Sequence, residues 1–281
     1  MATNDRPRYA GSTITSPAND RVRFIRSLYR TTVRRKEGLF VVEGVRLVED
    51  ALNSGATPDF VLVSPEQLDR TPRGSALLRR LAAFNCWPAT EGVLKAISDT
   101  VTPQGVIAIF PVPRPPAQPI QGPVVLVLDR LRDPGNAGTI LRSAEASGVV
   151  RCVAFVNSVD AYSPKVVRAA MGAHFRLTIL EDVQWNTLLP LLANRPRRLA
   201  VARGGTPYDR VDWLLDSALI LGGEAEGAGP EAEAVATEKI TIPMAGPAES
   251  LNAAMAGTIL LFEAARSRRD QRRNQSGVSG D

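Results

Sequence analysis

Residues 124–144, VVLVLDRLRDPGNAGTILRSA, predict a buried strand that runs into a helix. The apolar run 124–128 has the length and composition of a buried strand. Gly135 and Gly138 then permit close backbone approach, and Asn136 suits the start of the helix that follows. Arg142 lies on the first turns of this helix. Taken alone, the stretch is equally compatible with an ordinary strand-to-helix turn that carries a surface arginine.

A second buried strand, at 218–221, runs into the acidic glycine-rich turn 222–227, GGEAEG. This turn is neither a dinucleotide fingerprint nor a Walker sequence. The carboxylates of Glu224 and Glu226 repel phosphate, so a neutral or cationic ligand suits the turn better. A solvated acidic turn is the alternative.

A third stretch, 242–252, reads IPMAGPAESLN and opens an apolar helix expected over 253–265. Its two prolines and its glycine prevent regular structure, which leaves backbone N–H and C=O groups free to bind a ligand. Ser250 and Asn252 lie at the mouth of the helix, where either is also suited to be a simple cap.

The surrounding sequence predicts two α/β domains. Six prolines in residues 111–123 mark a linker at 111–122, with the larger domain at 123–268 and further strands at 152–156 and 198–201. The smaller domain, 16–110, has expected strands at 39–42, 60–63 and 106–110. Its helices are expected to begin at Ser16 and to include 66–84, against a mostly parallel sheet. Residues 1–15 and 269–281 are expected to be a flexible arm and a flexible tail.

Charge points to an RNA partner for the smaller domain. The chain has 34 Lys and Arg against 29 Asp and Glu, and the whole surplus lies in residues 1–121, with 16 basic and 11 acidic side chains. Arginine forms a good fork for phosphate. The candidate RNA-binding residues are Arg21, Arg23, Arg26, Arg30, Arg34, Arg35 and Lys36, with Lys165 and Arg168 near a later helix start. A solvated helix face is the alternative for each group.

Several classes are excluded by composition. His174 is the one histidine, so a His-rich metal site is impossible, and this residue is expected to be structural. Cys86 and Cys152 form no CxxC motif and are expected to be buried thiols of a reducing compartment. No apolar run approaches the length of a membrane span. A soluble cytoplasmic protein with no metal and no membrane partner is expected.

Together the three stretches resemble the signature motifs of the SpoU/TrmH family of RNA ribose 2′-O-methyltransferases, in the knotted SPOUT superfamily. N-x-G-x-x-x-R-S-A, G-x-E-x-E-G and I-P-M-x-G-x-x-x-S-L-N occur in order within 123–268. In the smaller domain, R-x-x-x-G-x-F-V-V-E-G over 34–44 is similar to the opening of the family's accessory substrate-binding domain, a ribosomal-protein-like fold.

The resemblance implies a fold, a cofactor and a set of roles. The larger domain is expected to carry a deep trefoil knot that binds S-adenosylmethionine, and the enzyme to be a homodimer whose active sites draw on both chains. The implied cofactor-binding residues are Gly222, Gly223, Ile242, Met244 and Leu251. The implied catalytic residues are Arg142, Asn136, Glu224, Ser250 and Asn252.

The chemistry favours one role for the arginine. A guanidine with a reference pKa of about 12.5 costs roughly 7 kcal/mol to neutralise at pH 7, so a base role for Arg142 is unfavourable. Orienting a phosphate and stabilising the developing alkoxide is the better hypothesis, with Glu224 as a candidate proton acceptor.

The expected activity is 2′-O-methylation of RNA, with 23S ribosomal RNA as the substrate, either as housekeeping modification or for antibiotic resistance. The accessory domain favours structured ribosomal RNA over tRNA. A catalytically silent RNA-binding or ribosome-assembly factor is the first alternative, and a small-molecule transferase on an α/β fold is the second.

Overall fold

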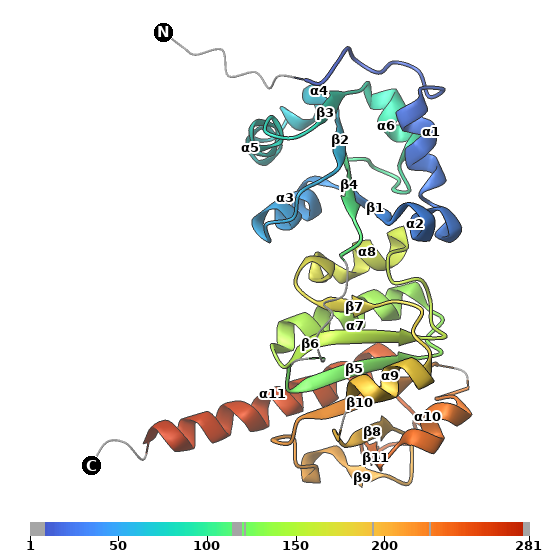
Figure 1. The fold of residues 1–281 in the computed structure, drawn as a ribbon. Coiled ribbons are helices and arrows are strands. Elements are labelled where there is room, and N and C mark those ends of the chain that lie inside the picture. Colours follow the sequence, from blue (N-terminus) through green and yellow to red (C-terminus); the bar gives the residue numbers. More distant parts are fainter. Residues whose placement is uncertain (1–8, 114–119, 121, 193, 225, 278–281) are drawn as a thin grey trace. The chain divides into compact units, whose positions relative to one another are not determined.

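The computed structural model describes residues 9–113, 120, 122–192, 194–224 and 226–277. The chain forms two compact units (Figure 1). Unit 1 comprises Met1–Pro113 and Tyr162–Phe175, and unit 2 comprises Arg114–Ala161 and Arg176–Asp281. Unit 2 therefore lacks one segment of the predicted domain 123–268, residues 162–175, which belongs to unit 1, and it extends beyond that domain at both ends. Of the predicted linker 111–122, residues 114–119 and 121 lie outside the described residues.

Unit 1 is built on a four-stranded sheet of order β1-β4-β2-β3, with β1 Leu39–Glu43, β2 Phe60–Val63, β3 Cys86–Pro88 and β4 Val106–Pro111. The strands predicted at 39–42, 60–63 and 106–110 are confirmed. The mostly parallel arrangement is wrong, because β4 enters between β1 and β2 and runs antiparallel to both, and only β2 and β3 pair in parallel.

The helices of unit 1 begin at residues that cap them well. The Asn19 side chain accepts from the Arg21 N–H, so α1 begins at Asp20 and not at the predicted Ser16. The single helix predicted over 66–84 is two helices, because Pro72 interrupts it and Thr71 caps the second. The helices are α1 Asp20–Ser27, α2 Thr31–Glu37, α3 Val45–Asn53, α4 Pro65–Leu68, α5 Pro72–Leu81, α6 Glu91–Ile97, α8 Pro164–Ala170 and the 3-10 turn η1 Ala173–Phe175.

Aromatic packing explains why the segment 162–175 belongs to unit 1. The Phe40 ring of β1 lies 5.0 Å from Tyr162 and 5.8 Å from Phe175, and Phe110 of β4 lies 5.1 Å from Phe175. His174 is buried within this cluster, 5.2 Å from Tyr162, which is consistent with the structural role expected for it. These rings bury a large apolar area against the sheet.

The predicted arm 1–15 is anchored where the structure describes it. The Ile14 N–H donates to the Pro88 carbonyl oxygen at 2.8 Å, and the Ile14 side chain is buried in the core of unit 1. Ala10 donates similarly to Cys86. Residues 9–14 therefore pair along β3, while residues 1–8 lie outside the described residues.

Unit 2 contains a seven-stranded sheet of order β7-β6-β5-β10-β8-β11-β9, in which all the recorded pairs are parallel. The strands are β5 Val124–Asp129, β6 Val150–Val156, β7 Thr178–Leu180, β8 Arg197–Ala200, β9 Thr206–Pro207, β10 Ser217–Gly222 and β11 Glu238–Thr241. The near-continuous apolar runs of β5 and β10 suit strands covered on both faces.

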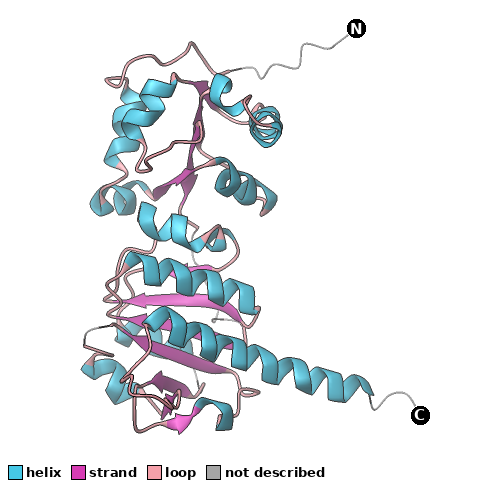
Figure 2. Ribbon diagram, turned by 180° about the vertical axis from the view of Figure 1, so that it is seen from behind, coloured by secondary structure: helices cyan, strands magenta, loops and turns pink. Residues whose placement is uncertain are grey.

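Helices cover both faces of this sheet. α9 Trp185–Leu192 and α10 Pro230–Val235 pack on one face, and α7 Pro134–Ser147 and α11 Ala253–Gly277 lie together on the other (Figure 2). A Cβ on Gly257 would lie 2.7 Å from Leu221, so this glycine lets α11 approach β10 closely. A 3-10 turn, η2 Tyr208–Arg210, completes the unit.

α11 is longer than predicted. The helix continues from the expected end at 265 to Gly277, into the predicted flexible tail. Arg266 bridges Glu263 and Asp270 on successive turns at 2.6 Å each, and Arg268 donates to the Leu214 carbonyl oxygen at 2.9 Å. These contacts stabilise an extension whose apolar pattern has ended. Residues 278–281 lie outside the described residues.

Candidate functional site

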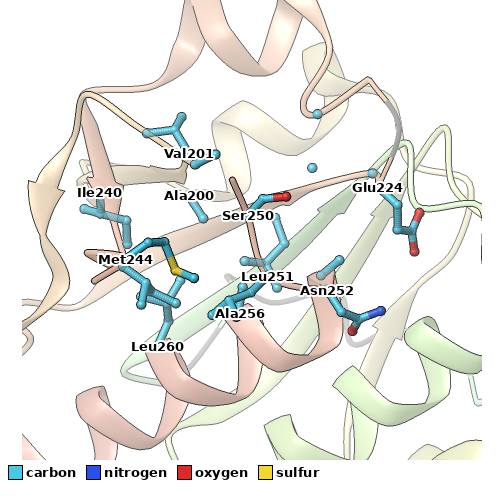
Figure 3. A pocket seen from close by; sticks show the side chains of 17 residues that line it. Ala200, Val201, Glu224, Ile240, Met244, Ser250, Leu251, Asn252, Ala256 and Leu260 are labelled. Atoms are coloured by element: carbon cyan, nitrogen blue, oxygen red, sulfur yellow. The ribbon is translucent and has the colours of Figure 1, made fainter. Parts of the chain in front are cut away.

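One cavity of unit 2 has a volume of about 460 Å³ and lies at the carboxyl ends of β8, β10 and β11 (Figure 3). Ligands of open parallel sheets bind at this edge, because the loops that follow the strands converge there. The lining residues are Ala200, Val201, Ala202, Leu221, Gly222, Gly223, Glu224, Gly227, Ile240, Ile242, Met244, Ser250, Leu251, Asn252, Ala253, Ala256 and Leu260.

All five predicted cofactor-binding residues line this cavity, and two of them are glycines for steric reasons. A Cβ on Gly222 would lie 2.3 Å from the Ala228 nitrogen, and one on Gly223 would lie 2.3 Å from the Arg130 carbonyl oxygen. Reciprocal hydrogen bonds of 3.1 Å between Gly223 and Gly227 close the turn. The acidic turn therefore folds tightly back on itself and forms one wall of the cavity.

A chain of hydrogen bonds joins the three sequence motifs at the mouth of the cavity. The Asn252 Oδ1 accepts the N–H groups of Ala254 at 2.9 Å and Met255 at 3.2 Å, which caps α11. Its Nδ2 is thereby turned outward and donates to the Asn136 Oδ1 at 3.0 Å. The Asn136 Nδ2 in turn donates to the Glu224 Oε1 at 2.6 Å. Two amides thus orient one exposed carboxylate.

Asn136 takes this position because another residue caps α7. The Asp133 side chain accepts from the Asn136 N–H at 2.7 Å and is the N-cap of the helix. The cap expected at Asn136 is therefore wrong, and the Asn136 side chain remains available for Glu224 and Asn252. Ser250 is exposed and lines the cavity, and no described residue forms a recorded hydrogen bond with its hydroxyl.

Arg142 lies outside this group within the single chain. It is exposed on α7, does not line the cavity, and follows Asn136 by six residues. At about 100° per residue the two side chains leave the helix roughly 120° apart. The structure therefore brings Asn136, Glu224, Ser250 and Asn252 together at one cavity and leaves Arg142 on a different face of the helix.

The predicted RNA-binding arginines divide by environment. Arg34 is 3% exposed, and its guanidinium donates to the Leu28 carbonyl oxygen at 2.6 Å and to the Thr31 hydroxyl at 3.1 Å. Its predicted RNA contact is wrong, because the side chain stabilises the turn between α1 and α2 from within. Arg21 is half-buried and stacks on the Trp87 ring at 3.6 Å.

The other basic candidates reach solvent. Arg26 donates to the Ala96 carbonyl oxygen at 3.0 Å, and Arg168 pairs with Asp99 at 2.7 Å on the surface of unit 1. The exposed side chains are Arg23, Arg26, Arg30, Arg35, Lys36 and Lys165, and Arg168 is half-buried. These residues keep a positive charge on unit 1.

Asp129 is a site-supporting residue that the motifs did not identify. It is 1% exposed and accepts from the Trp185 Nε1 at 3.1 Å and from the Gly229 N–H at 2.6 Å. It therefore ties the end of β5 to the end of the acidic turn. The signal in the sequence is a carboxylate that ends an otherwise apolar strand, since a buried charge needs such partners.

Both cysteines are buried free thiols, as expected, and burial raises the pKa of Cys86 and of Cys152 to about 12. In the described parts of the chain, His, Cys, Asp and Glu side chains form no group of three or more suited to hold a metal ion. None of the described helices combines the length and apolar character that a bilayer crossing requires.

Comparison with known proteins matches both parts of the chain. Residues 123–262 match the SpoU rRNA Methylase family, and residues 19–108 match the MRM3-like substrate binding domain. The chain is 33% identical to the mitochondrial rRNA methyltransferase 3 of Mus musculus, over 83% of this chain and 68% of that protein. It is 31% identical to the 23S rRNA (guanosine(2553)-2′-O)-methyltransferase RlmP of Bacillus subtilis, over 89% of this chain and 97% of that protein.

The fold has a close match among solved structures. A crystal structure of an rRNA methyltransferase from Sinorhizobium meliloti with bound AdoMet superposes with a TM-score of 0.76 at 31% sequence identity. The superposition covers 91% of this chain and 97% of that one.

Proposed function

Because this chain belongs to the SpoU rRNA methylase family, we propose that it transfers a methyl group from S-adenosylmethionine to a ribose 2′-hydroxyl of ribosomal RNA. The observation that carries this function is the hydrogen-bonded chain Asn252–Asn136–Glu224 at the mouth of the cavity. It unites one residue from each of the three motifs beside a space of ligand size.

The cavity fits the cofactor in size and in chemistry. About 460 Å³ is within the range of small-molecule sites. Its inner surface is apolar, with Leu221, Ile240 and Leu260, while the irregular loop 242–252 presents backbone donors and acceptors. Gly222, Gly223, Ile242, Met244 and Leu251 hold the cofactor in this proposal. When bound, S-adenosylmethionine supplies an electrophilic methyl group on a cationic sulfonium.

The chain's own residues then position the ribose hydroxyl and accept its proton. Glu224 is the acceptor candidate, because its carboxylate lies at the cavity mouth and Asn136 fixes its orientation. Ser250 and Asn252 complete the polar rim against which the ribose is placed. Arg142 orients a phosphate of the substrate and stabilises the developing alkoxide.

A homodimer accounts for the separation of Arg142 from its own cavity. Met255 and Phe262 are 62% and 40% exposed, and a spacing of seven residues puts them on one face of α11. Apolar side chains exposed in this way favour contact with a second copy. In the proposed dimer, Arg142 of one protomer serves the cavity of the other.

We also propose that unit 2 carries the trefoil knot implied by the resemblance. The sheet order β10-β8-β11 and the loops that follow β10 and β11 and line the cavity support it.

The substrate in this proposal is 23S ribosomal RNA, bound with the help of the exposed basic side chains of unit 1. The B. subtilis relative is named for a 23S rRNA nucleotide, and the match of residues 19–108 to a substrate-binding domain supports the same class of RNA. A housekeeping modification and antibiotic resistance are the two biological settings of this reaction.

The decisive experiment is methyl transfer from tritiated cofactor to unmodified ribosomal RNA, followed by mapping of 2′-O-methyl positions. A single labelled ribose is expected. Saturable cofactor binding without label on free RNA would direct the assay to assembled ribosomal particles. If the protein showed no label transfer and no cofactor binding, the proposal would be overturned, and a silent RNA-binding factor would be favoured.

A further inference from the structure

A second hollow of unit 2, of about 500 Å³, is open to solvent and lined by Arg130, Arg132, Asn157 and Ser158. It lies where β5 and β6 end, next to the turn that carries Glu224. Its lining contains two arginines and no carboxylate. We propose that this hollow is a subsite that binds a phosphate of the RNA strand next to the target ribose. Arg132 is the residue that makes the principal contact with this phosphate.

Hydrogen bonds hold the floor of this subsite rigid. The Ser158 hydroxyl accepts from the Leu131 N–H at 2.9 Å and donates to the Leu128 carbonyl oxygen at 2.8 Å. The Arg130 N–H donates to Val156 at 3.0 Å, and the Val159 N–H donates to the Leu131 carbonyl oxygen at 2.8 Å. The loops after β5 and β6 are therefore joined on both sides of Leu131.

The backbone is also held in an uncommon conformation at this point. Arg130 has φ 58° and Asn157 has φ 47°, in the left-handed region that residues other than glycine rarely adopt. Such conformations persist where the surrounding contacts over-determine them, and they concentrate at functional sites. The exposed Asn157 adds an amide that can donate to a phosphate oxygen.

The two arginines of the hollow differ in the contacts that their guanidinium groups make. The Arg130 Nε would be 2.7 Å from a Cβ on Gly229, and its guanidinium pairs with Glu226 at 3.5 Å. Arg130 thus lies along the acidic turn. Arg132 is exposed and has no recorded ion pair or hydrogen bond to the described residues. A free guanidinium on a fixed backbone is a preorganised fork for phosphate.

Chain connectivity and hydrogen bonds link the subsite to Glu224, the proposed proton acceptor. Arg132 precedes Asp133, whose carboxylate is engaged by the Asn136 N–H, and Asn136 donates to Glu224. The Arg130 carbonyl oxygen would be 2.3 Å from a Cβ on Gly223, the neighbour of Glu224. A phosphate held at Arg132 would therefore fix the strand relative to the carboxylate that faces the target hydroxyl. The inference rests on the proposed function for the identity of its ligand.

The test compares Arg132→Ala with Arg132→Lys and with Arg151→Ala, using unmodified ribosomal RNA. Arg151 is an exposed arginine near the amino end of β6, at the opposite edge of the sheet, and serves as the matched control. Arg132→Ala is expected to raise the KM for RNA about tenfold, with kcat and the Kd for S-adenosylmethionine near their original values. The slope of log K for RNA against log salt is expected to fall by about 0.7 to 0.9, the value of one phosphate contact.

Arg132→Lys is expected to recover part of the affinity, because the charge returns without the fork. Unchanged KM and salt slope in Arg132→Ala would overturn the subsite, and so would an equal effect of Arg151→Ala. If the unaltered protein neither labels RNA nor binds S-adenosylmethionine while Arg132→Ala still lowers the salt slope of RNA binding, the proposed reaction fails and the subsite stands.

Discussion

The Asn252 Nδ2 donates a hydrogen bond of 3.0 Å to the Asn136 Oδ1, although 116 residues separate the two in the chain. Asn252 can make this contact only because its Oδ1 is occupied by the first N–H groups of α11. A helix cap thus also determines which amide atom faces the active site. Asn252 therefore has a role in folding in addition to the one proposed for it in the chemistry.

Substitution of Asn252 should separate these two roles. Asn252→Asp keeps a good cap but removes the donor to Asn136, so the free energy of unfolding is expected to stay within about 0.5 kcal/mol while methyl transfer falls at least about tenfold. Asn252→Ala is expected to lose activity and about 1 kcal/mol of stability. Thermal unfolding and turnover on RNA measure the two effects. Full activity in Asn252→Asp would show that the hydrogen bond to Asn136 is unimportant.

Gly222→Ala should damage the cofactor cavity. The added Cβ would lie 2.3 Å from the Ala228 nitrogen, so the acidic turn must shift, and the Kd for S-adenosylmethionine is expected to rise at least about tenfold. Gly92→Ala is the control, since Gly92 lies in α6 with open space around its Cβ position, and it should be neutral or slightly stabilising. Calorimetric titration checks both, and normal affinity in Gly222→Ala would contradict the assigned cavity wall.

Complementation should reveal a shared active site. Arg142→Ala and Glu224→Gln are each expected to be inactive as homodimers. In a heterodimer of the two variants, one of the two cavities would have both original residues. Random assembly after co-expression makes about half of the dimers heterodimers, so about a quarter of the original activity is expected to return. No recovery, with heterodimers present by mass spectrometry, would place Arg142 at the cavity of its own chain.

The chemical role of Arg142 has its own test. Arg142→Lys is expected to keep most of the turnover at neutral pH, because an ammonium still orients a phosphate, whereas Arg142→Ala loses it. A pH–rate profile of Arg142→Lys distinguishes the roles further. Loss of activity in the lysine variant equal to that in Arg142→Ala would favour a strict guanidine role.

Adjacent arginines of α2 should behave differently. Arg34 is buried and its guanidinium bonds backbone and hydroxyl oxygens, so Arg34→Ala is expected to destabilise unit 1 by about 2 to 3 kcal/mol. Arg35 is exposed, and Arg35→Ala is expected to leave stability within about 0.5 kcal/mol while weakening RNA binding at low salt. Chemical unfolding and RNA titrations compare the pair. Equal stability of both variants would contradict the structural role of Arg34.

The buried thiols predict a pH dependence of stability. Burial holds the pKa of Cys86 and of Cys152 at about 12, above the ordinary value of 9.0. Below pH 9 the thiols are protonated in both the folded and the unfolded chain, so their contribution to the free energy of unfolding is complete. Between about pH 9 and 12 the unfolded thiols ionise first, so stability falls as the pH rises.

Thiol reactivity reports the same burial. A thiol reagent at pH 8 is expected to modify neither cysteine of the native protein and both after denaturation. Rapid modification in the native state would contradict the burial.

The sequence alone determined the elements whose signals are local. Apolar runs ended by aspartate or glycine specified β5 and β10, since a strand buried on both faces must be apolar throughout. The steric need for glycine at Gly222 and Gly223 is visible only in the folded turn, where an added Cβ would meet backbone atoms. The resemblance of the three motifs to those of the family implied residues that line the cavity and lie at its mouth.

The pairing of distant segments could be seen only in the folded chain. The antiparallel entry of β4, the packing of 162–175 on Phe40 and the burial of Arg34 all depend on partners far away in the chain or on the direction of approach. The sequence does not show which of the adjacent residues Arg34 and Arg35 is buried. Only the packing of α2 shows that the guanidinium of Arg34 is structural and that of Arg35 is exposed. The type of a side chain can be seen in the local sequence. Its burial, and the pairing of a strand, depend on contacts with other segments of the folded chain, so no single segment determines them.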